Sequence, residues 1–358
     1  MTVNQNFDPN GVGLHHKGIF GLPFSRDEAQ VVLIPAPWGV TVSFGGGTEK
    51  APKAIFEASP QIDYFHPSYG SDTWKIGVSM LPLADWDDAY REGVELREKA
   101  KLHIDELEQG HFIAAPPEIN DGCERFHTRI KKTASELLSK DKLVGLVGGD
   151  HSTPLGLMRA LAVKHAEFGI LQIDAHCDLR DSYEGFTYSH ASIMWNALKL
   201  PQIRKLVQVG VRDYSIGEKA VIDESGGRIQ TFFDDEMRRR QYEGARWVEI
   251  VHDIVAALPE NVYISFDIDG LDPSLCPNTG TPVPGGLQFQ EAMFLIQEVA
   301  RSGKTIIGFD LNEVSPGEDP SPAAAKAMAG NWDANVGMRV LWNLANWVAK
   351  SNSLKRLS

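Results

Sequence analysis

Apolar and polar residues alternate along this chain in a way that predicts repeated strand–helix units. Apolar runs of strand length occur at residues 30–38, 142–150, 169–175, 205–211, 261–269 and 304–314. Segments with apolar residues at helical spacing separate them, among them residues 84–110, 123–140, 287–303 and 336–349. Strands that are apolar throughout and joined by helices are typical of parallel sheets buried on both faces. The pattern therefore predicts an α/β fold with a mostly parallel sheet.

The same pattern suggests how the chain is divided. Residues 1–29 are polar and rich in Gly and Asn, and they are interpreted as an N-terminal arm outside the core. From residue 30 onward no linker is long enough to separate two domains, and the Pro- and Ala-rich stretch 315–330 is interpreted as a loop or short helix. We therefore expect one catalytic domain over residues 30–358.

Composition narrows the class of protein. A formal net charge of −13 argues against nucleic acid and anionic membranes as partners and is compatible with a cationic substrate. Three cysteines without a CxxC pair form no disulfide framework or zinc ribbon. The N-terminus lacks the plan of a signal peptide, and no apolar run reaches membrane-spanning length. These features indicate a soluble, cytoplasmic protein.

Residues that bind metals follow three of the predicted strands. In an open α/β sheet, ligands bind outside the carboxyl ends of the strands, so these residues are expected to meet at one edge. Each strand is followed by its own short motif, GGDH, DAHCD or DID. Together the motifs supply two imidazoles and four carboxylates: His151, Asp174, His176, Asp178, Asp267 and Asp269.

The number and type of these ligands predict two metal ions. Four carboxylates neutralise two divalent cations, and six side chains make two sites if two carboxylates bridge. Oxygen and nitrogen ligands fit Mn²⁺ or Ni²⁺ better than a structural zinc. Cys177 lies between two ligands and, by strand alternation, points away from them. Two metal ions that share a water lower its pKa and present hydroxide to an electrophilic carbon, which is metal-assisted hydrolysis.

At this point the sequence resembles the ureohydrolase family, which includes arginase, agmatinase, formiminoglutamase, guanidinobutyrase and guanidine hydrolase. The matching motifs are GGDHS, DAHCD, SFDIDGLDP, GTPVPGGL and NEVSP, spread from Gly148 to Pro316. The resemblance implies a three-layer αβα sandwich around a mostly parallel sheet of about eight strands. It also implies hydrolysis of a guanidinium C–N bond with release of urea.

The resemblance further implies a role for each motif residue. One metal would be held by His151, Asp174, Asp178 and Asp267, and the other by His176, Asp174, Asp267 and Asp269. Asp174 and Asp267 would bridge the two ions, and Asp178 would accept a hydrogen bond from the hydroxide. Glu291 matches the glutamate expected to pair with the guanidinium group. His190 matches a mobile histidine that serves as proton shuttle or general acid.

The loop PWGVTVS and the segment after DAHCD bear on the substrate. The loop looks like that of a nickel-dependent guanidine hydrolase subgroup, in which Thr41 matches a residue that contacts the substrate. Trp38 and Trp195 are candidates to close a small pocket or stack on a cation. Free guanidine, giving urea and ammonia, is therefore the first substrate hypothesis. Agmatine, with Asp181 or Glu184 as acceptor of its second cation, and 4-guanidinobutyrate stay open, whereas arginine is disfavoured.

Two other classes compete with this interpretation. Enzymes of the histone-deacetylase type share a related fold but use a single zinc ion and lack the paired Asp residues. A catalytically inactive regulatory relative would be expected to have lost ligands, and all six are present. We also expect a homo-oligomer, a trimer or a hexamer, and nickel-delivery accessory proteins are possible partners.

Overall fold

The computed structural model describes residues 7–14, 17–70, 72–317 and 331–356. Its centre is an eight-stranded sheet with the order β2-β1-β3-β8-β7-β4-β5-β6. Every pair of neighbouring strands in this sheet is parallel. The strands are β1 (Val31–Ala36), β2 (Val78–Met80), β3 (Leu143–Gly148), β4 (Phe168–Ile173), β5 (Ile203–Val209), β6 (Ile229–Phe232), β7 (Asn261–Asp267) and β8 (Thr305–Asn312).

The structure confirms the α/β class and the parallel sheet, and it adds two strands. Both added strands, β2 and β6, lie at the edges of the sheet and contain three and four residues. A short edge strand has one neighbour and little buried apolar surface, so it leaves no apolar run in the sequence. The six longer strands are the ones that the pattern predicted, and their residues are almost entirely buried.

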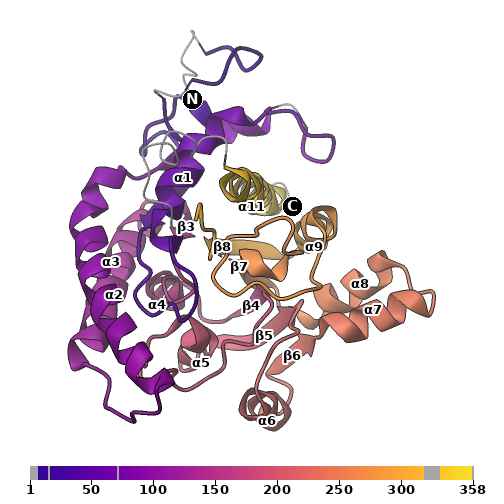
Figure 1. The fold of residues 1–358 in the computed structure, drawn as a ribbon. Coiled ribbons are helices and arrows are strands. Elements are labelled where there is room, and N and C mark those ends of the chain that lie inside the picture. Colours follow the sequence, from indigo (N-terminus) through magenta and orange to yellow (C-terminus); the bar gives the residue numbers. More distant parts are fainter. Residues whose placement is uncertain (1–6, 15–16, 71, 318–330, 357–358) are drawn as a thin grey trace.

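Helices cover both faces of the sheet, which confirms the three-layer sandwich (Figure 1). One layer contains α1 (Ala51–Ala58), α8 (Trp247–Ala257), α9 (Phe289–Arg301) and α11 (Trp332–Arg356). The other contains α2 (Asp87–Glu108), α3 (Pro117–Leu138), α4 (Leu155–Lys164) and α5 (Ile193–Leu198). Two further helices, α6 (Ile216–Glu224) and α7 (Asp234–Tyr242), lie on either side of β6 in the chain. Each layer has its own apolar core against the sheet.

The N-terminal arm is less separate from the core than its polarity predicts. Ile19, Phe20 and Leu22 are fully buried. The ring of Phe20 packs edge-on against Trp342 of α11, with 4.9 Å between centroids. The expectation that residues 1–29 lie outside the core is therefore wrong for residues 19–22, because three large apolar side chains are enough to anchor a short polar segment.

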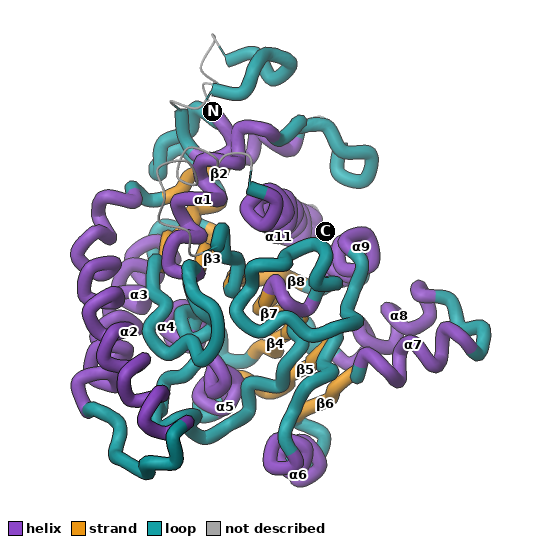
Figure 2. Tube along the Cα trace, in the orientation of Figure 1, coloured by secondary structure: helices purple, strands orange, loops and turns teal. Residues whose placement is uncertain are grey.

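The sheet places the functional loops on one side. Because all its strands are parallel, their carboxyl ends lie at a common edge. Ile173, the last residue of β4, pairs with Phe266 of β7, and Asp267 pairs with Asn312 of β8. The loops that follow these strands cross the front of the sheet in Figure 2. Within the described residues, no helix is long and apolar enough to cross a membrane.

Candidate metal centre

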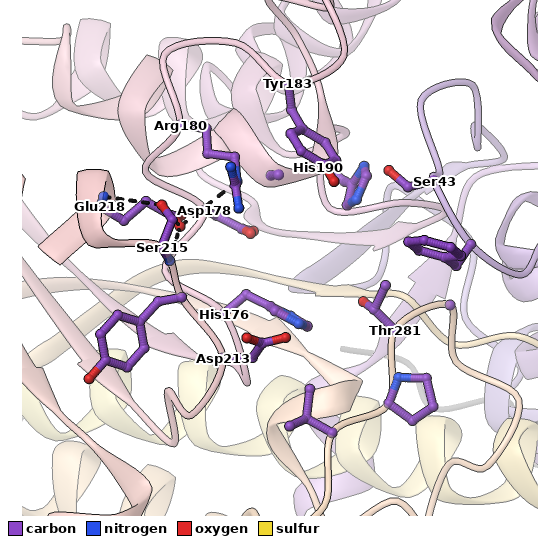
Figure 3. A pocket seen from close by; sticks show the side chains of 16 residues that line it. Ser43, His176, Asp178, Arg180, Tyr183, His190, Asp213, Ser215, Glu218 and Thr281 are labelled. Atoms are coloured by element: carbon purple, nitrogen blue, oxygen red, sulfur yellow. Dashed lines mark hydrogen bonds and ion pairs between the residues drawn. The ribbon is translucent and has the colours of Figure 1, made fainter. Parts of the chain in front are cut away.

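A pocket of about 490 Å³ opens at the carboxyl edge of the sheet. Figure 3 shows side chains from several segments that converge on it. His176, Asp178 and His190, all predicted from the sequence, line this pocket. The strand-end motifs therefore meet in space, as the parallel topology requires.

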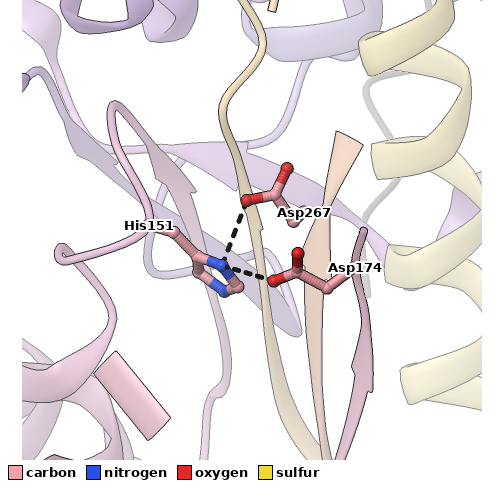
Figure 4. A group of neighbouring side chains, drawn as sticks. All are labelled: His151, Asp174 and Asp267. Atoms are coloured by element: carbon pink, nitrogen blue, oxygen red, sulfur yellow. Dashed lines mark ion pairs between the residues drawn. The ribbon is translucent and has the colours of Figure 1, made fainter. Parts of the chain in front are cut away.

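The first group of predicted ligands surrounds His151, which is 1% exposed (Figure 4). Its Nδ1 atom lies 3.0 Å from Asp174 Oδ2, 3.0 Å from Asp178 Oδ2 and 3.1 Å from Asp267 Oδ2. A single ring nitrogen carries at most one proton, so it cannot satisfy three carboxylates. The residues are those expected to hold the first metal, and together they form a geometry that a cation would fill.

The second group surrounds His176. Its Nδ1 atom lies 3.0 Å from Asp269 Oδ2 and 3.5 Å from Asp174 Oδ1. Asp174 thus has one oxygen in each group, which is the arrangement expected of a bridging carboxylate. Asp267 reaches only His151 here, so its bridging role stays a prediction.

Backbone amides orient three of the carboxylates. Oδ1 of Asp174 accepts a hydrogen bond from His176 N at 2.6 Å, and Oδ1 of Asp267 accepts one from Asp269 N at 2.9 Å. Oδ1 of Asp269 accepts from Ala175 N at 3.0 Å. The bonds of Asp174 and Asp267, each to the residue two positions later, are typical of Asx turns and explain the repeated spacing of two residues. Oδ2 of each carboxylate stays directed at a histidine.

The electrostatics of the group also call for a cation. Burial, with repulsion from Asp174, raises the pKa of Asp178 to about 7. Burial, with repulsion from Asp269 and Asp174, raises the pKa of Asp267 well above its usual range. Burial would lower the pKa of His151, but the surrounding carboxylates outweigh it and raise that pKa. Divalent ions would remove this crowding of negative charge, so the donor set fits two of them.

The second nitrogen of His151 is held from behind by Ser265. His151 Nε2 lies 2.9 Å from Ser265 Oγ, and Ser265 Oγ donates to Asp310 Oδ1 at 3.0 Å. Since the serine proton goes to Asp310, the serine oxygen must accept the proton on Nε2. This assigns His151 the tautomer that leaves the Nδ1 lone pair facing Asp174 and Asp267, as a metal ligand requires.

Asp174 is supported by a row of amides inside the sheet. Gln172 Nε2 donates to Asp174 Oδ2 at 2.7 Å, and Gln208 Nε2 donates to Gln172 Oε1 at 2.7 Å. Thr231 Oγ1 completes the row with a bond to Gln208 Oε1. Gln172 and Gln208 are fully buried, so the row accounts for the polar residues that interrupt β4 and β5.

Asp178 has a conformation that few residues adopt. Its φ angle is 55°, in the left-handed region, where Asp is better tolerated than most side chains. Met194 N and Trp195 N at the start of α5 donate to its carbonyl at 3.0 and 3.3 Å. These bonds hold the turn that directs the Asp178 side chain toward both His151 and the pocket.

His190 begins the turn that leads into α5 and lies in the pocket wall. Burial, with repulsion from His176, lowers its pKa to about 4, so it is neutral at pH 7. Its backbone N–H donates to Thr41 Oγ1 at 3.2 Å, and Tyr183 packs edge-on against its ring. The prediction that His190 moves a proton stays a prediction, and its location is compatible with it.

Three residues predicted to contact the substrate do not line the pocket. Thr41 is fully buried and holds the backbone of His190, so it positions another residue. Trp38 is fully buried and stacks on Phe126 in the helical core at 4.5 Å. Trp195 contributes a backbone N–H to the Asp178 turn. The expectation that Trp38 and Thr41 contact the substrate is therefore wrong, because both side chains are buried in the core. The role of Trp195, which is partly exposed, stays a prediction.

The prediction for Glu291 is also wrong. Its carboxylate forms two bonds of 2.9 Å with Arg238 and caps α9 by accepting from Gln288 N. It lines a different cavity, beside Trp247. A glutamate at the third position of a helix is a capping residue, and that structural alternative was visible in the sequence.

Glu313, which sequence reasoning missed, is the glutamate that lies beside the metal ligands. It is 5% exposed, and its Oε1 accepts from His151 N at 2.7 Å. Its φ angle is 60°, and its Oε2 is 3.7 Å from the point where a side chain on Gly280, a pocket residue, would begin. Burial, with repulsion from Asp150, raises its pKa well above the usual range. The signal was the motif NEVSP at the end of β8.

Comparisons with known proteins agree with this geometry. The model of the arginase family matches residues 29–334. The N(1)-aminopropylagmatine ureohydrolase of Thermus thermophilus is 31% identical over 290 residues, 81% of this chain and 84% of that protein. The agmatinase of Pyrococcus horikoshii is 28% identical over 84% of this chain and 90% of that protein.

Solved structures show the same fold. The proclavaminate amidino hydrolase from Streptomyces clavuligerus superposes with a TM-score of 0.70 and 22% identity, over 93% of this chain and 97% of that chain. The agmatine ureohydrolase of Thermoplasma volcanium gives 0.67 and 22%, over 98% and 97%. Enzymes of the matched family use a binuclear metal centre and hydrolyse C–N bonds of guanidino compounds. The chain therefore belongs to the arginase family and is a ureohydrolase.

Proposed function

We propose that this ureohydrolase acts on free guanidine and converts it to urea and ammonia. The observation that carries the proposal is the pair of His–Asp groups that share Asp174 beneath a single pocket. The charge of the pocket supports a substrate with one positive charge. Among the described residues, Asp178, Asp213 and Glu218 are the carboxylates that line it.

Two of these three carboxylates are already engaged. Asp178 belongs to the metal ligands, and both oxygens of Glu218 accept hydrogen bonds from neighbouring residues. Asp213 is left to interact with a substrate. Glu313 lies next to His151, and its Oε2 is 3.7 Å from the point where a side chain on the pocket residue Gly280 would begin. A pocket with so few available carboxylates suits one guanidinium group better than a molecule with a second cation.

The residues of the pocket have separate tasks in this reaction. Two divalent ions, Ni²⁺ or Mn²⁺, when bound by the two groups, supply a water that is acidic enough to react near neutral pH. Asp178, which contacts His151 and lines the pocket, would accept a hydrogen bond from a water held there. Glu313 offers a buried carboxylate to orient the guanidinium plane. His190, neutral at pH 7, carries a proton toward the departing ammonia.

Agmatine is the second candidate, because similar proteins are named agmatinase and N(1)-aminopropylagmatine ureohydrolase. Their named substrates carry at least one cation beyond the guanidinium group. Asp181 and Glu184, the acceptors considered for that cation, do not line the pocket. The Glu184 carboxylate accepts from Ser43 Oγ at 3.2 Å, and Asp181 accepts from Ser182 N at 2.8 Å. Agmatine would therefore have to place its ammonium group near Asp213.

A urea-release assay tests the proposal. The metal-free protein is loaded separately with Ni²⁺ and Mn²⁺ and offered guanidine, agmatine, arginine and 4-guanidinobutyrate. We expect kcat/KM to be highest for guanidine. A higher value for agmatine would replace guanidine as the substrate and leave the chemistry unchanged. Absence of urea with every compound and both metals would refute the proposed reaction.

We further propose a homo-oligomer, a trimer or hexamer, located in the cytoplasm and loaded with the help of nickel-delivery proteins. Sedimentation of the purified protein tests the assembly. Metal content of protein produced with and without such accessory proteins tests the loading.

A further inference from the structure

We propose that Arg180 selects substrates by charge, so that the pocket rejects guanidino compounds with a second cation and accepts those with a carboxylate. The proposal rests on the urea-releasing reaction proposed above. It assigns a specificity role to the residue that follows the DAHCD motif by two positions. The location of Arg180, the contacts that hold it and its available hydrogen-bond donors support this role.

Arg180 lies in the wall of the same pocket as His176 and Asp178. Figure 3 shows its guanidinium group between Glu218 and Tyr183. Its backbone N–H donates to Ala191 O at 3.1 Å, so the chain at this point is fixed to the turn that carries His190. The backbone that carries the charge of Arg180 is therefore held beside the pocket that contains His176 and Asp178.

Aromatic stacking fixes the side chain of Arg180. Its guanidinium carbon lies 4.7 Å from the centre of the Tyr183 ring. The ring of Tyr183 meets the ring of His190 edge-on, with centroids 6.1 Å apart. Cation–π stacking of this kind holds a guanidinium plane without using its N–H donors. The donors of Arg180 consequently remain available to a ligand.

Glu218 is too heavily engaged to neutralise Arg180 fully. Its Oε2 accepts from Ser215 N at 2.9 Å and from Ser215 Oγ at 2.8 Å, and its Oε1 accepts from Leu179 N at 3.1 Å. The closest approach of Arg180 Nε to Glu218 Oε2 is 3.8 Å, longer than a hydrogen bond. The pair therefore lacks the bidentate geometry of a strong Arg–carboxylate bridge.

Asp213 balances this charge at another point of the pocket. A backbone bridge joins Asp213 to His176, so its carboxylate belongs to the metal end. Figure 3 shows it beside His176 and away from Arg180. A guanidinium cation near the metals would therefore meet Asp213, whereas a chain that extends toward Arg180 would meet positive charge. An ammonium at the end of that chain is repelled and a carboxylate is bound.

Three substrates of matched chain length test this selection: 1-butylguanidine, agmatine and 4-guanidinobutyrate. They differ in what ends the chain, which is a methyl, an ammonium or a carboxylate. We expect Arg180→Gln to raise kcat/KM for agmatine relative to butylguanidine by about tenfold and to lower that for 4-guanidinobutyrate by a similar factor. Arg180→Lys, which keeps the charge, should retain the order of the wild-type enzyme.

Two controls separate charge from structure. Arg125→Gln removes an exposed arginine of α3 that pairs with Glu92 and should leave all three values unchanged. Raising the salt concentration should weaken the discrimination of the wild-type enzyme, because screening acts on charge and not on shape. The effects of Arg180→Gln should appear mainly in KM, since the side chain touches the tail of the substrate and not its reacting carbon.

The outcomes distinguish the two proposals. Urea release from guanidine together with unchanged substrate ratios in Arg180→Gln would overturn the charge selection alone. A loss of all activity in Arg180→Gln with retained activity in Arg180→Lys would show that the charge is needed for the reaction and would also overturn it. Absence of urea in the wild-type protein would instead refute the reaction on which the selection depends.

Discussion

Replacing Ser265 with alanine should weaken the binding of one metal ion and leave the other in place. Ser265 accepts from His151 Nε2 at 2.9 Å and donates to Asp310 at 3.0 Å, whereas no such contact links it to His176 among the described residues. The serine therefore fixes the tautomer and the ring plane of only one of the two histidines. Alanine removes both bonds without adding bulk.

The expected magnitude follows from burial. His151, Ser265 and Asp310 are at most 1% exposed, so water cannot replace the lost partner. Leaving a buried N–H without an acceptor costs about 1–3 kcal/mol. Loss of a residue that orients a metal ligand lowers metal affinity about 10- to 100-fold, which is the same range of free energy.

Calorimetric titration of the metal-free protein with Mn²⁺ measures the effect. Wild-type protein should bind two ions per chain, and Ser265→Ala should bind one with unchanged affinity and one about 10- to 100-fold more weakly. Ser265→Thr, which keeps the hydroxyl, is the matched control and should restore most of the lost affinity. Equal weakening of both ions, or no weakening, would show that Ser265 does not act through His151.

Three further predictions concern separate features of the structure. Asp174→Ala should abolish binding of both metal ions, because Asp174 contacts both histidines. Asp269→Ala should abolish binding of one ion, because Asp269 contacts only His176 of the two. Metal analysis that finds one ion bound to Asp174→Ala would contradict the shared role of Asp174. Glu313→Gln should lower kcat/KM for guanidine by about 100-fold through loss of the carboxylate proposed to orient the guanidinium plane. Glu291→Gln should change kcat/KM by less than about twofold and lower the free energy of unfolding by about 1 kcal/mol. A larger loss of kcat/KM in Glu291→Gln than in Glu313→Gln would instead support the role predicted for Glu291 from the sequence. Burial lowers the pKa of His127 to about 4, so as the pH falls below 6.5 the histidine takes up a proton in the unfolded chain before it does so in the folded one. The free energy of unfolding should therefore drop by about 3 kcal/mol between pH 6.5 and pH 4. Denaturant titrations of His127→Gln should lack that part of the drop.

The grouping of the candidate metal ligands could be predicted because it depends on strand ends and spacing. Asp174, His176 and Asp178 follow a buried strand at alternate positions, and Asp267 and Asp269 repeat the pattern on β7. A parallel sheet brings such ends together whatever the details of the loops. For the same reason the α/β class and six strands were evident, while β2 and β6 left no apolar run because they lie at the edges.

The residues around the substrate could not be predicted in this way. Glu291 and Glu313 both follow recognisable motifs, but an ion pair with Arg238 holds the first and a hydrogen bond to His151 N holds the second. Trp38 and Thr41 come from a loop that was expected to contact substrate, and the packing against Phe126 and the contact with His190 bury them. Which side of a loop faces a cavity depends on neighbours that are distant in sequence.

The sequence by itself determined the fold class, the hydrolytic chemistry and the residues predicted to hold the metals, because strand periodicity and coordination chemistry are local properties. The tertiary structure alone decided which glutamate lies beside the predicted metal ligands and that Arg180 borders the pocket. These results depend on contacts between segments more than a hundred residues apart, such as His151 with Asp267 and Glu313. Local patterns do not encode the direction of a side chain when packing between distant elements fixes it.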